Sequence, residues 1–148
     1  MKRFLFAAAL SLFAFSASAQ TAALSDDDYD TVFVNTHGFA HSCHDAVNDL
    51  RSETTEEKIE TADTVCAAFV AGSYLLTHTE DGVARLDRYI KEEPEERLKA
   101  AKEFYIVGRE VSVLARVYGP ARLPRLAAIA EYLSGLESQP EVDAEEYL

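Results

Sequence analysis

Residues 37–77 read HGFAHSCHDAVNDLRSETTEEKIETADTVCAAFVAGSYLLT, and this stretch decides the fold. It contains the two cysteines of the chain, Cys43 and Cys66, and their midpoint falls between Thr54 and Thr55. The midpoint lies in a polar segment, Arg51–Thr55, whose residue types favour helix caps and turns. Two antiparallel helices joined there place the cysteines opposite each other. The symmetric spacing therefore predicts a helical hairpin closed by a Cys43–Cys66 disulfide.

Apolar residues on both sides of this turn recur every three or four positions, the period of a helix that buries one face. The first helix is expected to begin at the acidic run Asp26–Asp28, one residue of which can cap it. Gly38 leaves open either a kink or two shorter helices. In the second helix, Thr54 and Glu57 match a capping box. The predicted buried positions are Tyr29, Val32, Thr36, Ala40, Cys43, Val47 and Leu50, then Ile59, Ala62, Cys66, Phe69, Val70, Ser73 and Thr77.

Three further helical segments follow the hairpin. Residues 83–90 form a short helix, Pro94 suits the first turn of the next, and Gly119–Pro120 ends that one. Its second half, residues 104–118, is apolar on almost every face, which is typical of a central helix packed on several sides. Leucines between residues 123 and 136 mark the last helix. No strand-like alternation exceeds four residues, so we predict an all-α, disulfide-stapled bundle of four to six helices.

The N-terminus has the features of a secretory signal peptide. Lys2 and Arg3 precede an apolar run, Phe4–Phe15, and Ala17–Ala19 forms an A-x-A cleavage site. We therefore predict a signal peptide over residues 1–19, a single helical domain over residues 20–136, an acidic disordered tail over residues 137–148, and a periplasmic protein. The apolar run is too short to span a bilayer, and no later segment is apolar for long enough to do so.

The charge balance limits the classes of partner. Removing Lys2 and Arg3 leaves 12 basic against 26 acidic side chains, a net charge near −14. This charge excludes nucleic acid and anionic membranes as preferred partners and favours a cationic protein or loosely held metal cations. A second copy of the chain, forming a homodimer, is a further option. The candidates for an apolar contact are the aromatic residues Tyr74, Tyr89, Phe104, Tyr105 and Tyr118, because a small core cannot easily hide them all.

Three histidines form the sharpest chemical feature. His37, His41 and His44 fall within about 60° of one another on a helical wheel. An i, i+4 histidine pair can chelate a first-row metal ion, and the third histidine lies within reach, so these residues are a candidate divalent-metal site. The alternative is a polar helix boundary whose histidines bond locally.

Signals for catalysis are weak. The Gly72–Ser73 pair lies inside a helical segment and not in a strand-to-helix elbow, Cys43 has a partner cysteine, and no glycine-rich phosphate loop is present. We therefore expect a non-enzymatic protein without a resident cofactor. Arg109 and Arg116, together with Glu103 and Glu110, are interpreted as a structural strip of ion pairs.

Residues 66–72 have the form C-x-x-F-x-x-G on an amphipathic helix, after an earlier helix that carries one cysteine. With the signal peptide and the all-α pattern, this resembles the Rap/Tai-type periplasmic immunity proteins, which neutralise peptidoglycan amidase toxins of type VI secretion. The family usually has tyrosine at the position of Phe69 and more cysteines near its C-terminus. The resemblance implies that Cys43, Cys66 and Gly72 shape the scaffold. A metal-binding or metal-sensing protein that uses the histidine face, and an acid-stress periplasmic chaperone, are the alternatives.

Overall fold

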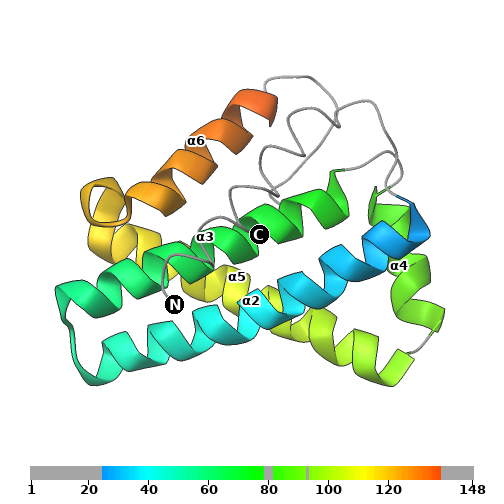
Figure 1. Ribbon diagram of the computed structural model, residues 1–148, viewed down its shortest axis with the longest axis horizontal. Helices are drawn as coiled ribbons and strands as arrows, with labels where there is room; N and C mark the ends of the chain where they lie inside the picture. Colours follow the sequence, from blue (N-terminus) through cyan, green and yellow to red (C-terminus); the bar gives the residue numbers. More distant parts are fainter. Residues whose placement is uncertain (1–24, 79–81, 93, 138–148) are drawn as a thin grey trace.

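A computed structural model describes residues 25–78, 82–92 and 94–137, and this part of the chain is all-α. Its five helices are α2 (Asp26–Ser52), α3 (Glu56–Thr77), α4 (Gly82–Glu92), α5 (Pro94–Arg122) and α6 (Pro124–Glu137) (Figure 1). The predicted fold class is therefore confirmed. The proposed signal peptide and all but the first residue of the proposed acidic tail lie outside the described residues.

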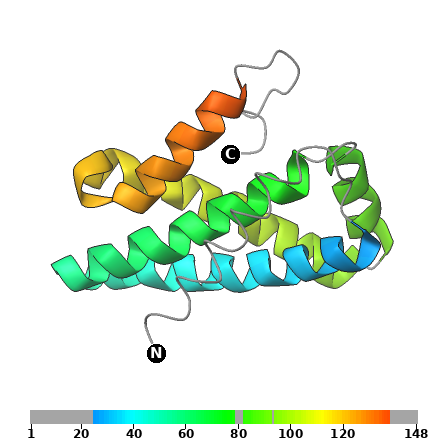
Figure 2. The ribbon, with the colours of Figure 1, turned by 45° about the horizontal axis from the view of Figure 1, so that its top comes forward.

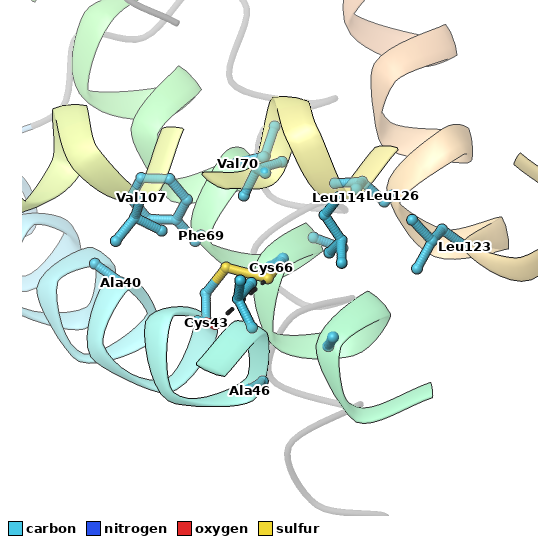
Figure 3. Close-up of a cluster of buried hydrophobic side chains, with 14 of the residues drawn as sticks. Ala40, Cys43, Ala46, Cys66, Phe69, Val70, Val107, Leu114, Leu123 and Leu126 are labelled. Carbon is cyan, nitrogen blue, oxygen red and sulfur yellow. Dashed lines mark hydrogen bonds between the residues drawn. A yellow bond between two sulfur atoms is a disulfide. The ribbon is translucent and has the colours of Figure 1, made fainter. Parts of the chain in front are cut away.

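Helices α2 and α3 form the predicted hairpin and lie side by side in both views (Figure 1, Figure 2). Cys43 and Cys66 are bonded, with an S–S distance of 2.07 Å and a Cα–Cα distance of 4.8 Å. Both cysteines are fully buried, and the disulfide lies among side chains of α2, α3 and α5 (Figure 3). Ala40 and Ala62 are also buried, and their small side chains suit this close approach of the two helices.

The capping residues of both hairpin helices differ from the predicted ones. Ser25, and none of the aspartates, caps α2 by accepting a hydrogen bond from the Asp28 amide. Thr55, and not Thr54, caps α3 through the Lys58 amide. The Thr54 hydroxyl is turned back to donate to the Leu50 carbonyl, which closes the end of α2 instead. Gly38 does not interrupt α2, which runs as one helix.

The central helix is α3, and not α5 as predicted. Ten of its residues are buried, against five in the longer α5. Helix α5 also contacts the other four helices, yet one of its faces is left uncovered by the described residues. The prediction was wrong because an all-round apolar helix does not reveal from its own sequence which face the rest of the chain will cover.

A second, smaller cluster packs the far end of the hairpin against α4. Tyr29, Phe33 and Leu76 are buried there, and Tyr89 of α4 packs on both aromatic rings. The Tyr29 hydroxyl donates to the Leu76 carbonyl at 3.2 Å. Burial raises the pKa of Tyr29 to about 12, against the opposing influence of the nearby Arg85 guanidinium, so this hydroxyl remains a donor well above neutral pH.

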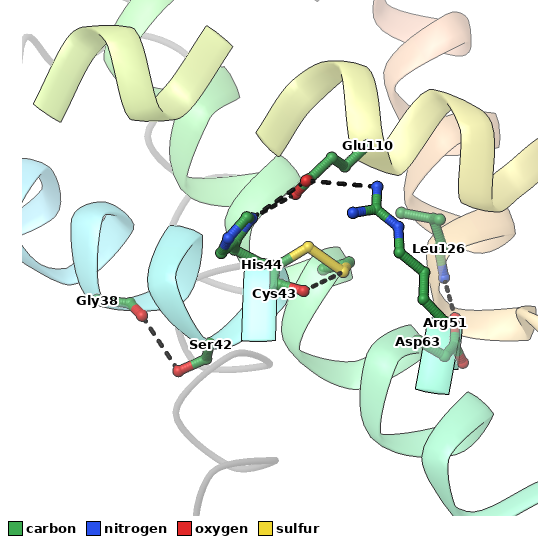
Figure 4. Close-up of a disulfide and its surroundings, with 9 residues drawn as sticks. Gly38, Ser42, Cys43, His44, Arg51, Asp63, Glu110 and Leu126 are labelled. Atoms are coloured by element: carbon green, nitrogen blue, oxygen red, sulfur yellow. Dashed lines mark hydrogen bonds and ion pairs between the residues drawn. A yellow bond between two sulfur atoms is a disulfide. The ribbon is translucent and has the colours of Figure 1, made fainter. Parts of the chain in front are cut away.

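The start of α6 is held by a buried carboxylate of α3. Helix α5 is kinked at Gly119, whose φ of 74° breaks the helical path; the element ends at Arg122, and Leu123 then precedes α6. Asp63 is fully buried, and its two oxygens accept hydrogen bonds from the Arg125 and Leu126 amides at 3.1 and 2.8 Å. Figure 4 shows the bond from Leu126. Leu123 has no side-chain acceptor for these amides, so Asp63 caps α6 from another helix.

Helix α3 is the one described helix long and apolar enough to cross a membrane by length and composition. Of its most apolar 18-residue segment, 61% is buried inside the protein.

Replacing Gly72 by alanine should destabilise the protein, whereas the same change at Gly38 should stabilise it. A Cβ atom on Gly72 would lie 2.2 Å from Oγ1 of Thr36, which is itself buried and bonded to the Val32 carbonyl. We expect Gly72→Ala to lower the free energy of unfolding by about 2 kcal/mol, as in other overpacked cores.

Gly38 is the matched control, since nothing lies within 4 Å of a Cβ placed there. Gly38→Ala should raise the free energy of unfolding by roughly 0.5–1 kcal/mol through helix propensity. Denaturant titration of the oxidised variants measures both changes. A stabilised Gly72→Ala variant would contradict the scaffold role of this glycine.

Candidate functional site

His37 and His41 lie one turn apart on α2 and face the same carboxylate of α5. Nε2 of His37 lies 2.5 Å from Oε2 of Glu103, and Nε2 of His41 lies 3.4 Å from that same oxygen. The two imidazole rings are 4.8 Å apart between centroids. The three potential ligand atoms all lie within 4.8 Å of one another. These side chains are therefore gathered at one point between the two helices.

His44 belongs to a second cluster, one step further along the same two helices. Its Nδ1 lies 2.9 Å from a carboxylate oxygen of Glu110 (Figure 4). Its Nε2 lies 3.0 Å from the side-chain amide nitrogen of Asn48. Arg51 also approaches Glu110, at 3.7 Å. The structure thus groups two of the three predicted histidines with Glu103, and it separates His44 from that group.

The two clusters repeat at the same interval on both helices. His37 and His44 are seven residues apart, as are Glu103 and Glu110, so each histidine meets the glutamate 66 positions later. Helices α2 and α5 run in the same direction at this contact (Figure 1). We call the six side chains His37, His41, His44, Arg51, Glu103 and Glu110 the α2–α5 seam.

The ion pairs predicted within α5 do not form between its own arginines and glutamates. Glu103 and Glu110 turn to α2, as described above. The guanidinium of Arg109 lies 6.0 Å from the centre of the Tyr105 ring, and Nε of Arg116 donates to the Ser112 carbonyl. The glutamates and the histidines were each singled out from the sequence, but their pairing across the two helices was not predicted.

Beside the seam, the part of α5 from residue 105 to residue 117 carries four large apolar side chains that are exposed to solvent. Their exposed fractions are 58% for Tyr105, 51% for Ile106, 53% for Val113 and 68% for Val117. We call these four residues the α5 row. Tyr74, Tyr89, Phe104 and Tyr118, which were also predicted as contact aromatics, are each partly covered. Sequence analysis therefore identified one member of the row and missed its aliphatic residues.

The row continues into a hollow that reaches the seam. This hollow has a volume of about 330 Å³, and Val113 and Val117 line it together with Arg51 and Glu110. A second, shallower hollow lies at Tyr105 and Ile106. Val113 and Val117 of the row therefore share one hollow with the second half of the seam.

The charges beside the row are positive, although the whole chain is acidic. Lys102, Arg109 and Arg116 are exposed, and on a helical wheel they lie between Tyr105 and the three aliphatic residues. The other charged residues of this segment, Glu103 and Glu110, are turned to α2 and partly buried. The local charge of this surface is thus opposite in sign to the net charge of −12.

No family model, no curated protein and no solved structure matches this chain.

Proposed function

We propose that this protein is a non-enzymatic protein-binding domain and that the α5 row is its contact surface. The observation that carries the proposal is the row itself. Five of the seven large apolar side chains exposed in the described residues lie on this one helix, and four of them, the α5 row, fall between residues 105 and 117. Contiguous exposed apolar side chains rimmed by polar residues are typical of protein interaction sites.

The composition of the surface indicates the chemistry of the partner. Val113 and Val117 offer an apolar centre next to a hollow, and full burial of such a side chain contributes roughly 1.5–3 kcal/mol. Lys102, Arg109 and Arg116 favour carboxylates on the opposing rim. The net charge attracts a cationic protein from a distance, so the partner we expect is basic overall and carries an apolar anchor flanked by acidic side chains at the contact.

The specific form we propose is a periplasmic immunity-type inhibitor of a cell-wall amidase. Its support is the C-x-x-F-x-x-G segment, in which Cys66 forms the disulfide and Gly72 lies against Thr36. These contacts support the scaffold role that the resemblance implies for both residues. The contact residues come from α5, outside that segment, and depend on the exposure of the row.

A glutamate placed in the row should abolish binding to the natural partner. We expect Val117→Glu to cost about 2 kcal/mol or more of binding free energy, as at an interface hot spot, because it buries an unpaired charge. This corresponds to an affinity loss of roughly thirtyfold or more. The oxidised chain is immobilised, proteins retained from envelope extract are identified by mass spectrometry, and the purified partner is titrated against each variant.

Val34→Glu is the matched control. Val34 is a valine of α2 that is 60% exposed, close to the exposure of Val117, and it is not part of the row. Retention of a wall-cleaving amidase, inhibited by the wild type and by Val34→Glu but not by Val117→Glu, would support the full proposal. Equal binding by all three chains would refute the assignment to α5, and failure to retain any protein would contradict the binding function.

A further inference from the structure

We infer that His37, His41 and Glu103 form a binding site for a divalent first-row transition-metal ion, of the zinc type, between α2 and α5. This inference does not rest on the proposed protein-binding function. It differs from the set expected from the sequence alone, because a carboxylate of α5 takes the place of His44.

The three ligand atoms lie within 4.8 Å of one another, so small side-chain movements bring them to the spacing that a metal requires. Nitrogen and oxygen ligands about 2.0–2.1 Å from a tetrahedral zinc ion are separated from one another by about 3.3 Å. The distance from His41 Nε2 to Glu103 Oε2 is 3.4 Å, which matches this spacing. His37 and Glu103 lie 2.5 Å apart, so this pair must open by about 0.8 Å, a movement within the reach of a glutamate side chain.

The helices hold the two histidines in place for chelation. His37 and His41 are separated by four residues on α2, which is continuous across Gly38, so both side chains project from the same face. Cys43 lies two residues after His41 and is bonded to α3, which anchors this part of α2. A bound ion would thus join α5 to the disulfide-linked hairpin.

The site has room for the remaining ligands of the ion. The side chains of His37, His41 and Glu103 are 35%, 60% and 25% exposed, so solvent reaches the fourth coordination position. Two imidazole donors and one carboxylate suit zinc, copper or nickel, whereas calcium and magnesium prefer oxygen ligands alone. Excess magnesium therefore occupies the many carboxylates of this acidic chain without competing well for the histidines.

Calorimetric titration with Zn²⁺, on tag-free oxidised protein in excess Mg²⁺, tests the inference. We expect one equivalent of Zn²⁺ per chain. His41→Ala and Glu103→Gln should each weaken binding by at least about tenfold, since each removes a direct ligand. His44→Ala is the matched control, because His44 is a histidine of the same helix that also bonds to an α5 glutamate; it should bind as the wild type does. Zn²⁺ should also raise the melting temperature of the wild type more than that of His41→Ala.

Each other result would contradict the site. Equal binding by wild type and His41→Ala would show that the metal is held by scattered carboxylates. A loss of Zn²⁺ affinity in His44→Ala as large as that in His41→Ala would show that the three histidines bind the ion instead. Circular dichroism of His41→Ala, whose side chain is largely exposed, verifies that a loss of binding is not a loss of fold.

Discussion

Replacing both cysteines by alanine should lower the free energy of unfolding by about 3 kcal/mol. The bond between Cys43 and Cys66 closes a loop with a sequence separation of 23, and such a loop restricts the unfolded chain by about this amount in the chain-entropy account. The two sulfur atoms are also fully buried within the main core cluster, so the variant loses packing as well. Urea denaturation, followed by circular dichroism, measures the change.

The reduced wild type separates the two contributions. It keeps both sulfur atoms in the core and loses only the covalent link, so its stability should fall between those of the oxidised chain and the alanine variant. Intact mass after alkylation, with and without reduction, establishes the state of each sample. Equal stability of oxidised and reduced chains, or two free thiols in protein isolated from cells, would contradict a structural role for the disulfide.

The hairpin was predictable because several independent signals in its sequence agree. The apolar residues of the first helix recur so that they lie on one face, and all seven residues predicted for that face are buried. The two cysteines then set the register of the second helix against the first. The errors at the N-caps are small. Ser25, Thr54 and Thr55 all have side chains that can cap a helix, and the choice among neighbours depends on the residue at which each helix begins.

The packing of α5 was not predictable by this approach. Its apolar residues surround the helix, so its hydrophobic period does not distinguish the face against α2 and α3 from the face that remains exposed. The histidine–glutamate pairs of the seam were equally hidden. Both seven-residue intervals are visible in the sequence, but their pairing requires α2 and α5 to run in the same direction, and that follows only from the path of the whole chain.

Asp63 shows how a residue can be missed because its type suggests the surface. It follows Ala62 and lies one turn before Cys66 and Ala67, which are buried, so its position on α3 faces the core. A carboxylate there is expected to be solvent-exposed unless something satisfies it. The N-terminus of α6 satisfies this carboxylate, because its amides donate to it and the positive end of the helix dipole favours an anion. The sequence around residue 63 does not indicate that α6 will pack there.

Asp63→Ala should therefore destabilise the protein about as much as loss of the disulfide, by about 3 kcal/mol, because two amide donors at a buried helix end lose their acceptor together. The stability of Asp63→Asn should lie between that of the wild type and that of Asp63→Ala, since one amide oxygen replaces two carboxylate oxygens. Glu60→Ala is the control: Glu60 is exposed and pairs with Arg125 at 3.8 Å, so its removal should change stability by less than about 0.5 kcal/mol. Denaturant titration gives the stabilities, and hydrogen exchange at the Arg125 and Leu126 amides should accelerate in Asp63→Ala but not in Glu60→Ala. If Glu60→Ala were equally destabilising, the ion pair with Arg125 would hold α6, and the cap would not.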